Sequence, residues 1–254
     1  MEKNIHFIWF DFNNGKTLQD FPTFIQNMEE TKKLNPNANI ILWNDKSALE
    51  AIENANLEET FKIRFLNYWN NKENWRYYIK RPDIFRYLII YLQGGIYIDL
   101  DNVPLQSYDN LFKEKLVMAI TNKDNPIKVG SQFHTELITD DFCGGHKGNL
   151  YFLELCNIIL TEYERINQIE AYKNRVFRYV SRGYKMTNKY AKNWIKQNKE
   201  ANYKILTLNR IDPINSGTEY FRQERAFTWY DLKGDKLDET GCFKKTKKTK
   251  ITIY

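Results

Sequence analysis

The residues of this sequence whose types and spacing suggest chemistry are two aspartates separated by a single residue, Asp99 and Asp101. They close the apolar segment 96–100, which predicts a buried strand. Side chains two apart on a strand project to the same side, so both carboxylates would emerge at the strand's carboxyl end, where open α/β sheets bind ligands. Neighbouring carboxylates repel unless a cation or a hydrogen-bond donor holds them. Hard oxygen ligands suit Mg²⁺ or Mn²⁺, and the pattern therefore indicates a divalent-metal site with a diphosphate as the natural ligand.

A helix and a tight turn should position this pair. Residues 82–93 predict a helix that starts with a proline in its first turn, where the missing N–H costs nothing. Asp83 and Arg86 are three residues apart and therefore share a helix face. Gly94 can take the left-handed conformation that closes a helix, and Gly95 lets the chain turn sharply into the strand.

The remaining hydrophobic pattern predicts an α/β fold with an α-rich second half. Residues 5–10, 17–34 and 40–43 read as strand, helix and strand, which is a βαβ unit and implies a parallel sheet. Further strands are expected at 115–120 and 205–208, and further helices at 48–55, 57–69, 151–169 and 188–197.

The block from Asp83 to Asp101 resembles the sugar-binding region of glycosyltransferases that contain the Asp-x-Asp motif, a family with initiation α-1,6-mannosyltransferases and α-1,4-galactosyltransferases. It is also similar to the catalytic domain of glucosylating toxins. The matching positions are Asp83, Arg86, Leu92, Gly94, Gly95, Tyr97, Asp99 and Asp101, with Pro82 where the family usually has Ser. The segment 5–9 resembles the family's first strand, Ile-His-x-Ile-Trp, and 39–45 its second. The resemblance implies a GT-A (Rossmann-like) fold and retaining transfer of a hexosyl group from a nucleotide sugar, UDP- or GDP-linked.

The resemblance also implies roles for these positions. Asp101, assisted by Asp99, would hold Mn²⁺ or Mg²⁺ against the leaving diphosphate, and Asp99 would also contact the ribose or the sugar. Arg86 would donate to the diphosphate or to the donor sugar. The donor-binding positions implied in this way are Ile8, Trp9, Asp83, Arg86, Gly95 and Asp99.

The second half should supply further metal and acceptor contacts. The candidates are Asp140 and Asp141, beside Gly144-Gly145-His146, and the segment 229–231, whose Trp229 would lie near a loop that closes over the donor. His6 and Trp9 fit a core position as well as a ligand-binding one. His134 and His146 lack the spacing of a zinc pair.

Two other functions are compatible with parts of the pattern. Residues 98–103 also resemble the Asp-x-Asp-x-Val strand of haloacid dehalogenase-type phosphatases, in which Asp99 would be the nucleophile and Asp101 the acid/base, with Asp140 and Asp141 as the later acidic pair. That interpretation leaves Arg86 and the two glycines unexplained. The second alternative is a non-catalytic sugar- or nucleotide-binding module.

Charge and length constrain the partners and the domain organisation. The 254 residues carry a net charge of +6, and five lysines between Lys244 and Lys250 account for all but +1 of it. The nearly neutral body does not support nucleic-acid binding. We predict one glycosyltransferase domain over residues 1–243, with a nucleotide-sugar-binding half (1–105) and an acceptor half (106–243), followed by a basic tail (244–254) that could touch a membrane peripherally.

The expected acceptor is a saccharide or a protein. No apolar run is long enough for a signal peptide or a membrane span, and three cysteines without Cys-x-x-Cys spacing argue against disulfides or zinc. We therefore expect a cytoplasmic protein with reduced thiols.

Overall fold

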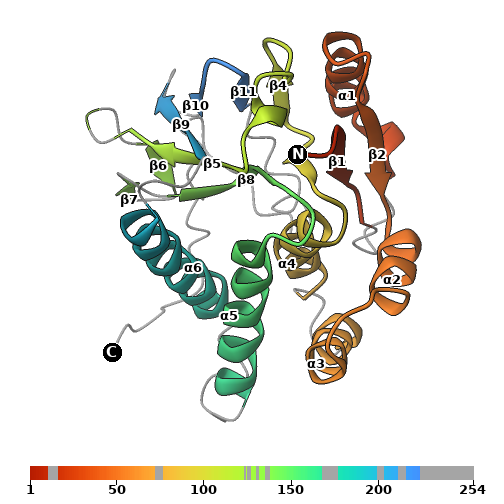
Figure 1. Ribbon diagram of the computed structural model, residues 1–254, viewed down its shortest axis with the longest axis vertical. Coiled ribbons are helices and arrows are strands. Elements are labelled where there is room, and N and C mark those ends of the chain that lie inside the picture. Colours follow the sequence, from red (N-terminus) through yellow and green to blue (C-terminus); the bar gives the residue numbers. More distant parts are fainter. Residues whose placement is uncertain are drawn as a thin grey trace, which may run out of the picture.

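The computed structural model describes residues 1–10, 17–71, 77–122, 124, 127–129, 132–134, 138–167, 177–198, 203–210 and 216–223. Within these ranges one mixed sheet forms the centre of the molecule, in the order β2-β1-β3-β8-β5-β9-β10-β11-β4 (Figure 1). Its strands are β1 (Asn4–Ile8), β2 (Asn39–Trp43), β3 (Gly95–Ile98), β4 (Asn102–Pro104), β5 (Leu116–Thr121), β8 (Ile138–Gly145), β9 (Tyr203–Arg210), β10 (Ser216–Gly217) and β11 (Phe221–Gln223). A separate antiparallel hairpin joins β6 (Ile127–Val129) to β7 (Gln132–His134).

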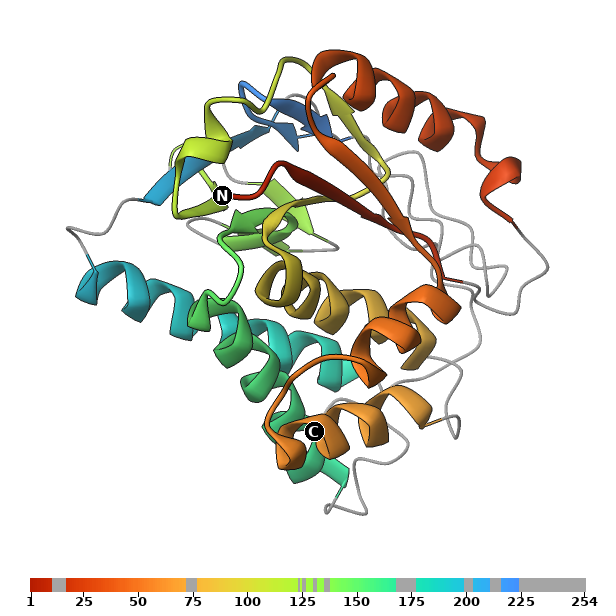
Figure 2. The ribbon, with the colours of Figure 1, turned by 45° about the vertical axis from the view of Figure 1, so that its right-hand side comes forward.

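Helices cover both faces of this sheet (Figure 2). They are η1 (Leu18–Asp20), α1 (Pro22–Leu34), α2 (Asp45–Glu53), α3 (Glu59–Asn70), α4 (Tyr77–Gln93), η2 (Leu111–Lys113), α5 (Leu150–Asn167) and α6 (Phe177–Gln197). One apolar core joins α2 to α6 with the sheet, and a second core joins α1 and η2 with the opposite face. Strand residues alternate between these cores, so that Ile96 and Ile98 belong to the second and Tyr97 to the first.

The α/β, Rossmann-like class predicted from the sequence is confirmed. β1 pairs in parallel with β2, Ile5 opposite Ile40, and in parallel with β3, Ile5 opposite Ile96. In the second half, β5, β8 and β9 form the middle of the same sheet, and β8 is a strand that was not predicted. β8 runs antiparallel between β3 and β5.

Three helix predictions differ from the structure, one of them because α6 begins at Phe177 and not near Asn188. The predicted first helix is divided at Phe21 into η1 and α1, because Pro22 occupies the first position of α1. α4 begins at Tyr77 rather than at Pro82, which lies inside the helix. The early turns of α4 are anchored by Arg81, whose Nε and Nη2 donate to the carbonyl of Trp69 at 2.9 and 2.7 Å. These hydrogen bonds offset part of the cost of a proline inside a helix.

The turn from α4 into β3 requires its two glycines. Gly94 and Gly95 have φ angles of +66° and +105°, which residues with a Cβ rarely adopt. A Cβ on Gly95 would also lie 2.4 Å from the carbonyl oxygen of Asn4 on β1. Close contact between β1 and β3 therefore depends on glycine at this position.

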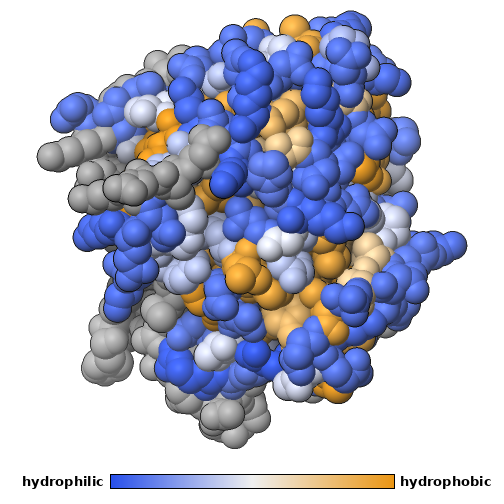
Figure 3. Space-filling view, viewed as in Figure 1, coloured by the Kyte–Doolittle hydropathy of each residue, from blue (hydrophilic) through white to orange (hydrophobic). Residues whose placement is uncertain are grey.

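The surface is polar, and none of the described helices combines the length and the apolar character needed to cross a membrane. Figure 3 shows mostly hydrophilic side chains, with smaller apolar areas between them. The large apolar side chains that are exposed come from separate elements, namely Leu42, Ile63, Leu105 and Leu150.

His6 is a core residue with an unusual acid–base property. Its ring is fully buried, Nδ1 accepts a hydrogen bond from Trp43 Nε1 at 3.1 Å, and Nε2 donates to the carbonyl of Gly94 at 2.8 Å. Burial lowers the pKa of His6 to about 4, although the hydrogen bond to Gly94 acts in the opposite direction. His6 therefore helps to hold the turn before β3 as a neutral imidazole.

We expect this histidine to make the fold sensitive to acid. The unfolded chain takes up a proton near pH 6.5 and the folded chain near pH 4, so stability is complete above pH 6.5 and falls by about 3 kcal/mol as the pH drops to 4. Urea unfolding at pH 7 and pH 4.5 should show this loss in the native protein and a smaller loss in His6→Gln. His146→Gln, at an exposed loop position, is the control and should behave as the native protein does. If native protein and His6→Gln lose the same unfolding free energy between pH 7 and pH 4.5, His6 is not the source of the acid sensitivity.

Candidate functional site

The Asp-x-Asp segment forms a tight turn directly after β3. The strand ends at Ile98, two residues earlier than predicted, because the chain turns at residues 100–101. The backbone N–H of Asp99 still donates to the carbonyl of Asp141 on β8, at 2.9 Å. The N–H of Asn102 closes the turn on the carbonyl of Asp99 at 3.1 Å. The two carboxylates therefore lie on a turn between β3 and β4, at the carboxyl end of β3.

Two asparagines hold this turn in place, and sequence reasoning assigned them no role. Asn27 of α1 donates through Nδ2 to the carbonyl of Leu100 at 2.9 Å. Asn102 donates through Nδ2 to the carbonyl of Asp141 at 3.0 Å and is fully buried. Nothing in their local sequence signals these contacts, because both span long separations along the chain.

Arg86 is the centre of the site. Its side chain is only 7% exposed, and it reaches three acidic residues from different elements. Nη2 lies 2.7 Å from Asp83 Oδ1, and Nη1 lies 3.4 Å from Asp99 Oδ1. Nη1 also donates to the carbonyl of Asp140 at 2.8 Å, and the Asp140 carboxylate lies 3.5 Å away. The structure thus brings together Asp83, Arg86, Asp99 and Asp140, four of the residues predicted to form the site.

Tyr97 is a further member of the cluster and contacts both Arg86 and Asp99. The Arg86 guanidinium lies over its ring, 4.9 Å from the ring centre, and its hydroxyl donates to Oδ1 of Asp99. Burial raises the pKa of Tyr97 well above its usual value, so the hydroxyl keeps its proton. Tyr97 is part of the sequence motif. Its role as a hydrogen-bond donor to Asp99 could not be predicted, because that role depends on the orientation of its ring toward α4.

The electrostatics of the cluster favour a bound cation. Burial raises the pKa of Asp99 well above its usual value, and the charges of Asp101 and Asp141 raise it further, against the opposing effects of Arg86 and Tyr97. Burial would lower the pKa of Arg86, but Asp140, Tyr97, Asp99 and Asp83 together raise it well above its usual value. One guanidinium thus faces several carboxylates, and a divalent ion would relieve the remaining repulsion.

The donor set fits a magnesium-type ion that keeps other oxygen ligands. Among the residues that the structure describes, no group of three or more His, Cys, Asp or Glu side chains could hold a metal by itself. Mg²⁺ is commonly bound through one or two carboxylates together with waters and substrate phosphates. Asp99 and Asp101 could supply such a partial shell.

The end of β1 lies at the same edge of the sheet. β1 and β3 are parallel neighbours, with His6 opposite Tyr97, so Ile8 and Trp9 follow at the level of the Asp99 turn. Ile8 is 8% exposed and belongs to the core under α4. The ring of Trp9 packs against Phe21 of the α1 side, at 5.1 Å between ring centres.

Other predicted residues lie away from this edge or outside the described residues. Gly95 begins β3 and pairs with Gly145, so it lies at the end of the strand opposite to Asp99. His146 is exposed in the loop that follows Gly145. The side chain of His134, the segment 229–231 and the tail 244–254 are not among the described residues.

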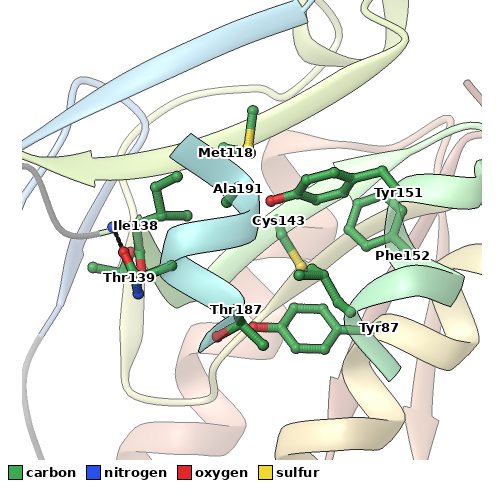
Figure 4. A pocket seen from close by; sticks show the side chains of 11 residues that line it. Tyr87, Met118, Ile138, Thr139, Cys143, Tyr151, Phe152, Thr187 and Ala191 are labelled. Atoms are coloured by element: carbon green, nitrogen blue, oxygen red, sulfur yellow. Dashed lines mark hydrogen bonds between the residues drawn. The ribbon is translucent and has the colours of Figure 1, made fainter. Parts of the chain in front are cut away.

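A small internal cavity behind the site is not a donor pocket. It lies between α4, α5, α6 and β8, and Tyr87, Thr139 and Cys143 are among the residues that line it (Figure 4). Its volume is about 10 Å³, which is room for one water molecule. The hydroxyl of Thr139 is buried without a hydrogen-bond partner and would suit such a water.

Comparison with known proteins agrees with the resemblance found in the sequence. Residues 22–118 match the family described as glycosyltransferase sugar-binding region containing DXD motif. The mannosyl phosphorylinositol ceramide synthase SUR1 of Saccharomyces cerevisiae is 33% identical over 98 residues, which are 39% of this chain and 22% of that protein. The match thus spans about a fifth of that relative's length.

Two solved glycosyltransferase structures are also similar. PaToxG glycosyltransferase is 17% identical with a TM-score of 0.47, over 78% of this chain and 70% of that chain. The ligand-free glycosyltransferase domain from the YGT toxin is 10% identical with a TM-score of 0.35, over 77% and 68%. The predicted resemblance is therefore confirmed by the family match: residues 22–118, which contain Asp83, Arg86, Asp99 and Asp101, carry the sugar-binding region of DXD-containing glycosyltransferases.

Proposed function

We propose that this protein is a metal-dependent glycosyltransferase with a GT-A domain, which moves a hexosyl group from a UDP- or GDP-linked sugar to a saccharide, lipid-linked saccharide or protein acceptor with retention. The observation that carries the proposal is the Arg86 cluster beside the Asp99–Asp101 turn, at the carboxyl edge of two parallel strands. The family match supports the same reaction class.

In this proposal Asp101 and Asp99 hold Mn²⁺ or Mg²⁺ and thereby the diphosphate. Transfer would break the bond between the anomeric carbon and the diphosphate oxygen and form a bond from that carbon to an acceptor hydroxyl oxygen, whose proton would pass to the departing diphosphate. A divalent ion held by Asp101 and Asp99 would stabilise the negative charge on the leaving group. Asp83, with a side chain 35% exposed, is available to accept hydrogen bonds from sugar hydroxyls. Ile8 and Trp9 border the nucleoside at the neighbouring strand end.

Arg86 has a different role from the one that the resemblance implies. Its nitrogens already donate to Pro82, Asp83, Asp99 and Asp140, and the side chain is nearly buried. We therefore assign it as a positioning residue that orients Asp99 and opposes the rise of its pKa, rather than as a direct donor to the diphosphate.

The proposal also covers the acceptor and the cellular compartment. The name of the yeast relative points to mannose as the sugar and to phosphorylinositol ceramide as the acceptor, so a mannose donor and an inositol-containing lipid are the first substrates to test. The thiols of Cys143 and Cys156 are free and buried, which supports the cytoplasm as the compartment.

The test is a panel of nucleotide sugars with and without Mn²⁺. We expect at least one UDP- or GDP-sugar to release free nucleotide only when Mn²⁺ or Mg²⁺ is present, and release to increase with a suitable acceptor. Turnover of p-nitrophenyl phosphate without any reaction of nucleotide sugars would instead identify the phosphatase. Saturable binding of a nucleotide sugar without turnover would identify the non-catalytic module. The hydrogen bonds that Asp99 Oδ1 accepts from Tyr97 and Arg86 favour the transferase over an Asp99 nucleophile.

A further inference from the structure

The helix α6 carries a regular row of positive charges. Its sequence contains basic residues at positions 178, 182, 185, 189, 192 and 196 and no aspartate or glutamate between 177 and 197. Steps of three and four residues keep the row on one face of a helix. Between Lys189 and Lys196 the row extends about 10 Å along the axis.

The opposite face of α6 is fixed to the protein. Ala191 is buried, and the ring of Trp194 lies 5.3 Å from Tyr151 of α5 and 5.8 Å from Tyr203 of β9, between ring centres. α6 lies beside α5, on the outside of the helical layer (Figures 1 and 2). The packed apolar face therefore directs the lysine face away from the core.

The lysines of this face are not neutralised. Lys189 and Lys196 are exposed and Lys192 is half-buried, and in the part of the chain that the structure describes none of the three forms an ion pair. Other lysines do have acidic partners, for example Lys46 with Glu50. On α5, Glu154 is exposed; burial raises the pKa of Tyr190 on α6, and the charge of Glu154 raises it further.

We propose that this lysine face of α6 (Lys189, Lys192 and Lys196) docks the protein on an anionic membrane surface. The attraction is electrostatic and involves no insertion, because the apolar residues of α6 are already packed against α5 and β9. The same packing excludes capture of α6 in a partner's apolar groove, since such binding needs a free apolar face. Lysines on mobile stems suit many lipid headgroups, whereas recognition of one fixed phosphate favours arginine.

Docking through α6 would also set the position of the candidate site. Asn188, one residue before Lys189, accepts from the N–H of Ile138 at 2.7 Å and donates to its carbonyl at 3.0 Å. Ile138 begins β8, the strand that also carries Asp140 of the Arg86 cluster. A membrane-bound α6 would thus hold the site edge beside the membrane, where lipid-linked acceptors lie.

Vesicle sedimentation with the full-length protein tests the proposal. With vesicles of phosphatidylcholine and 30% phosphatidylserine at low salt we expect binding, and with phosphatidylcholine alone none. Binding should be lost in 0.5 M NaCl. The triple variant Lys189→Gln, Lys192→Gln, Lys196→Gln should bind the anionic vesicles at least tenfold more weakly, with unchanged thermal unfolding.

Two matched variants keep the test specific. Lys32→Gln, Lys46→Gln, Lys113→Gln removes the same charge from α1, α2 and η2 and should bind within about twofold of the native protein. Replacement of the five tail lysines between 244 and 250 by glutamine measures the contribution of the tail. Loss of binding confined to the tail variant, equal losses in both triple variants, or binding of RNA or an acidic protein in preference to vesicles would overturn the proposal. Release of nucleotide from a soluble donor should not change in the α6 variant, so this result is separable from the proposed transferase activity.

Discussion

Replacing Asp101 with asparagine is expected to abolish sugar transfer, lowering kcat by about a thousandfold or more. The change removes one of the two carboxylates of the turn after β3 and with it the charge that would hold a cation against the diphosphate. The shape of the side chain is conserved, and Asp101 is a half-buried residue of the turn after β3. Thermal unfolding should therefore shift by only a few degrees. The measurement is nucleotide release from the active donor across a range of Mn²⁺ concentrations.

Asp99→Asn should cause a loss of similar size, because its Oδ1 can still accept from Tyr97 and Arg86 while its charge is absent. Asp109→Asn is the matched control. It removes an equal charge from an exposed residue that is paired with Lys3 and lies beyond β4, outside the turn, and it should leave kcat unchanged. Native turnover in Asp101→Asn, with Mn²⁺ dependence intact, would exclude this residue from the metal site.

Replacing Arg86 with methionine is expected to lower both stability and activity. Removal of a nearly buried cation leaves Asp83, Asp99 and Asp140 without their shared partner, which should cost about 3–5 kcal/mol of unfolding free energy. Arg64→Met is the control. It breaks a more exposed pair with Glu164 on α5 and should cost about 1 kcal/mol or less. Urea unfolding measures both.

The pH dependence of the Arg86→Met defect distinguishes lost charge from lost packing. Arg86 opposes the raised pKa of Asp99, so its removal raises that pKa further above the value in the unfolded chain. A group with a raised folded pKa stabilises the fold at low pH and loses that effect as the pH rises. The defect should therefore be larger at pH 8 than at pH 5. A defect of constant size would indicate a packing role alone. Arg86→Lys keeps the positive charge but lacks the planar set of donors of the guanidinium. It should recover most of the stability but little of kcat.

Several elements follow from local sequence. The βαβ unit of β1, α1 and β2 has strong apolar periodicity and ends at clear turn residues, and its strands pair in parallel as predicted. The Gly94-Gly95 turn is equally local, since positive φ angles select glycine whatever surrounds them.

β8 could not be predicted in this way. Its sequence contains Asp140, Asp141, Gly144 and Gly145, which are residue types depleted in strands. It is a strand because β3 and β5 pair with it on both sides, and a Cβ on Gly144 would lie 2.9 Å from the carbonyl oxygen of Gly95. Long-range pairing here outweighs local preference.

The sequence by itself determined the α/β class, the Gly94-Gly95 turn before the strand that leads to the Asp-x-Asp pair, and the family resemblance, because these depend on spacing along a few neighbouring residues. Only the tertiary structure decided that Asp83, Asp99 and Asp140 together occupy the hydrogen-bond donors of Arg86. The same is true of the hydrogen bond from Tyr97 to Asp99 and of the neutral, buried state of His6. The physical reason is that burial and charge at one point arise from elements far apart in the chain. An antiparallel strand between β3 and β5 brings the Asp140 carbonyl to Arg86, and no local pattern encodes that distance.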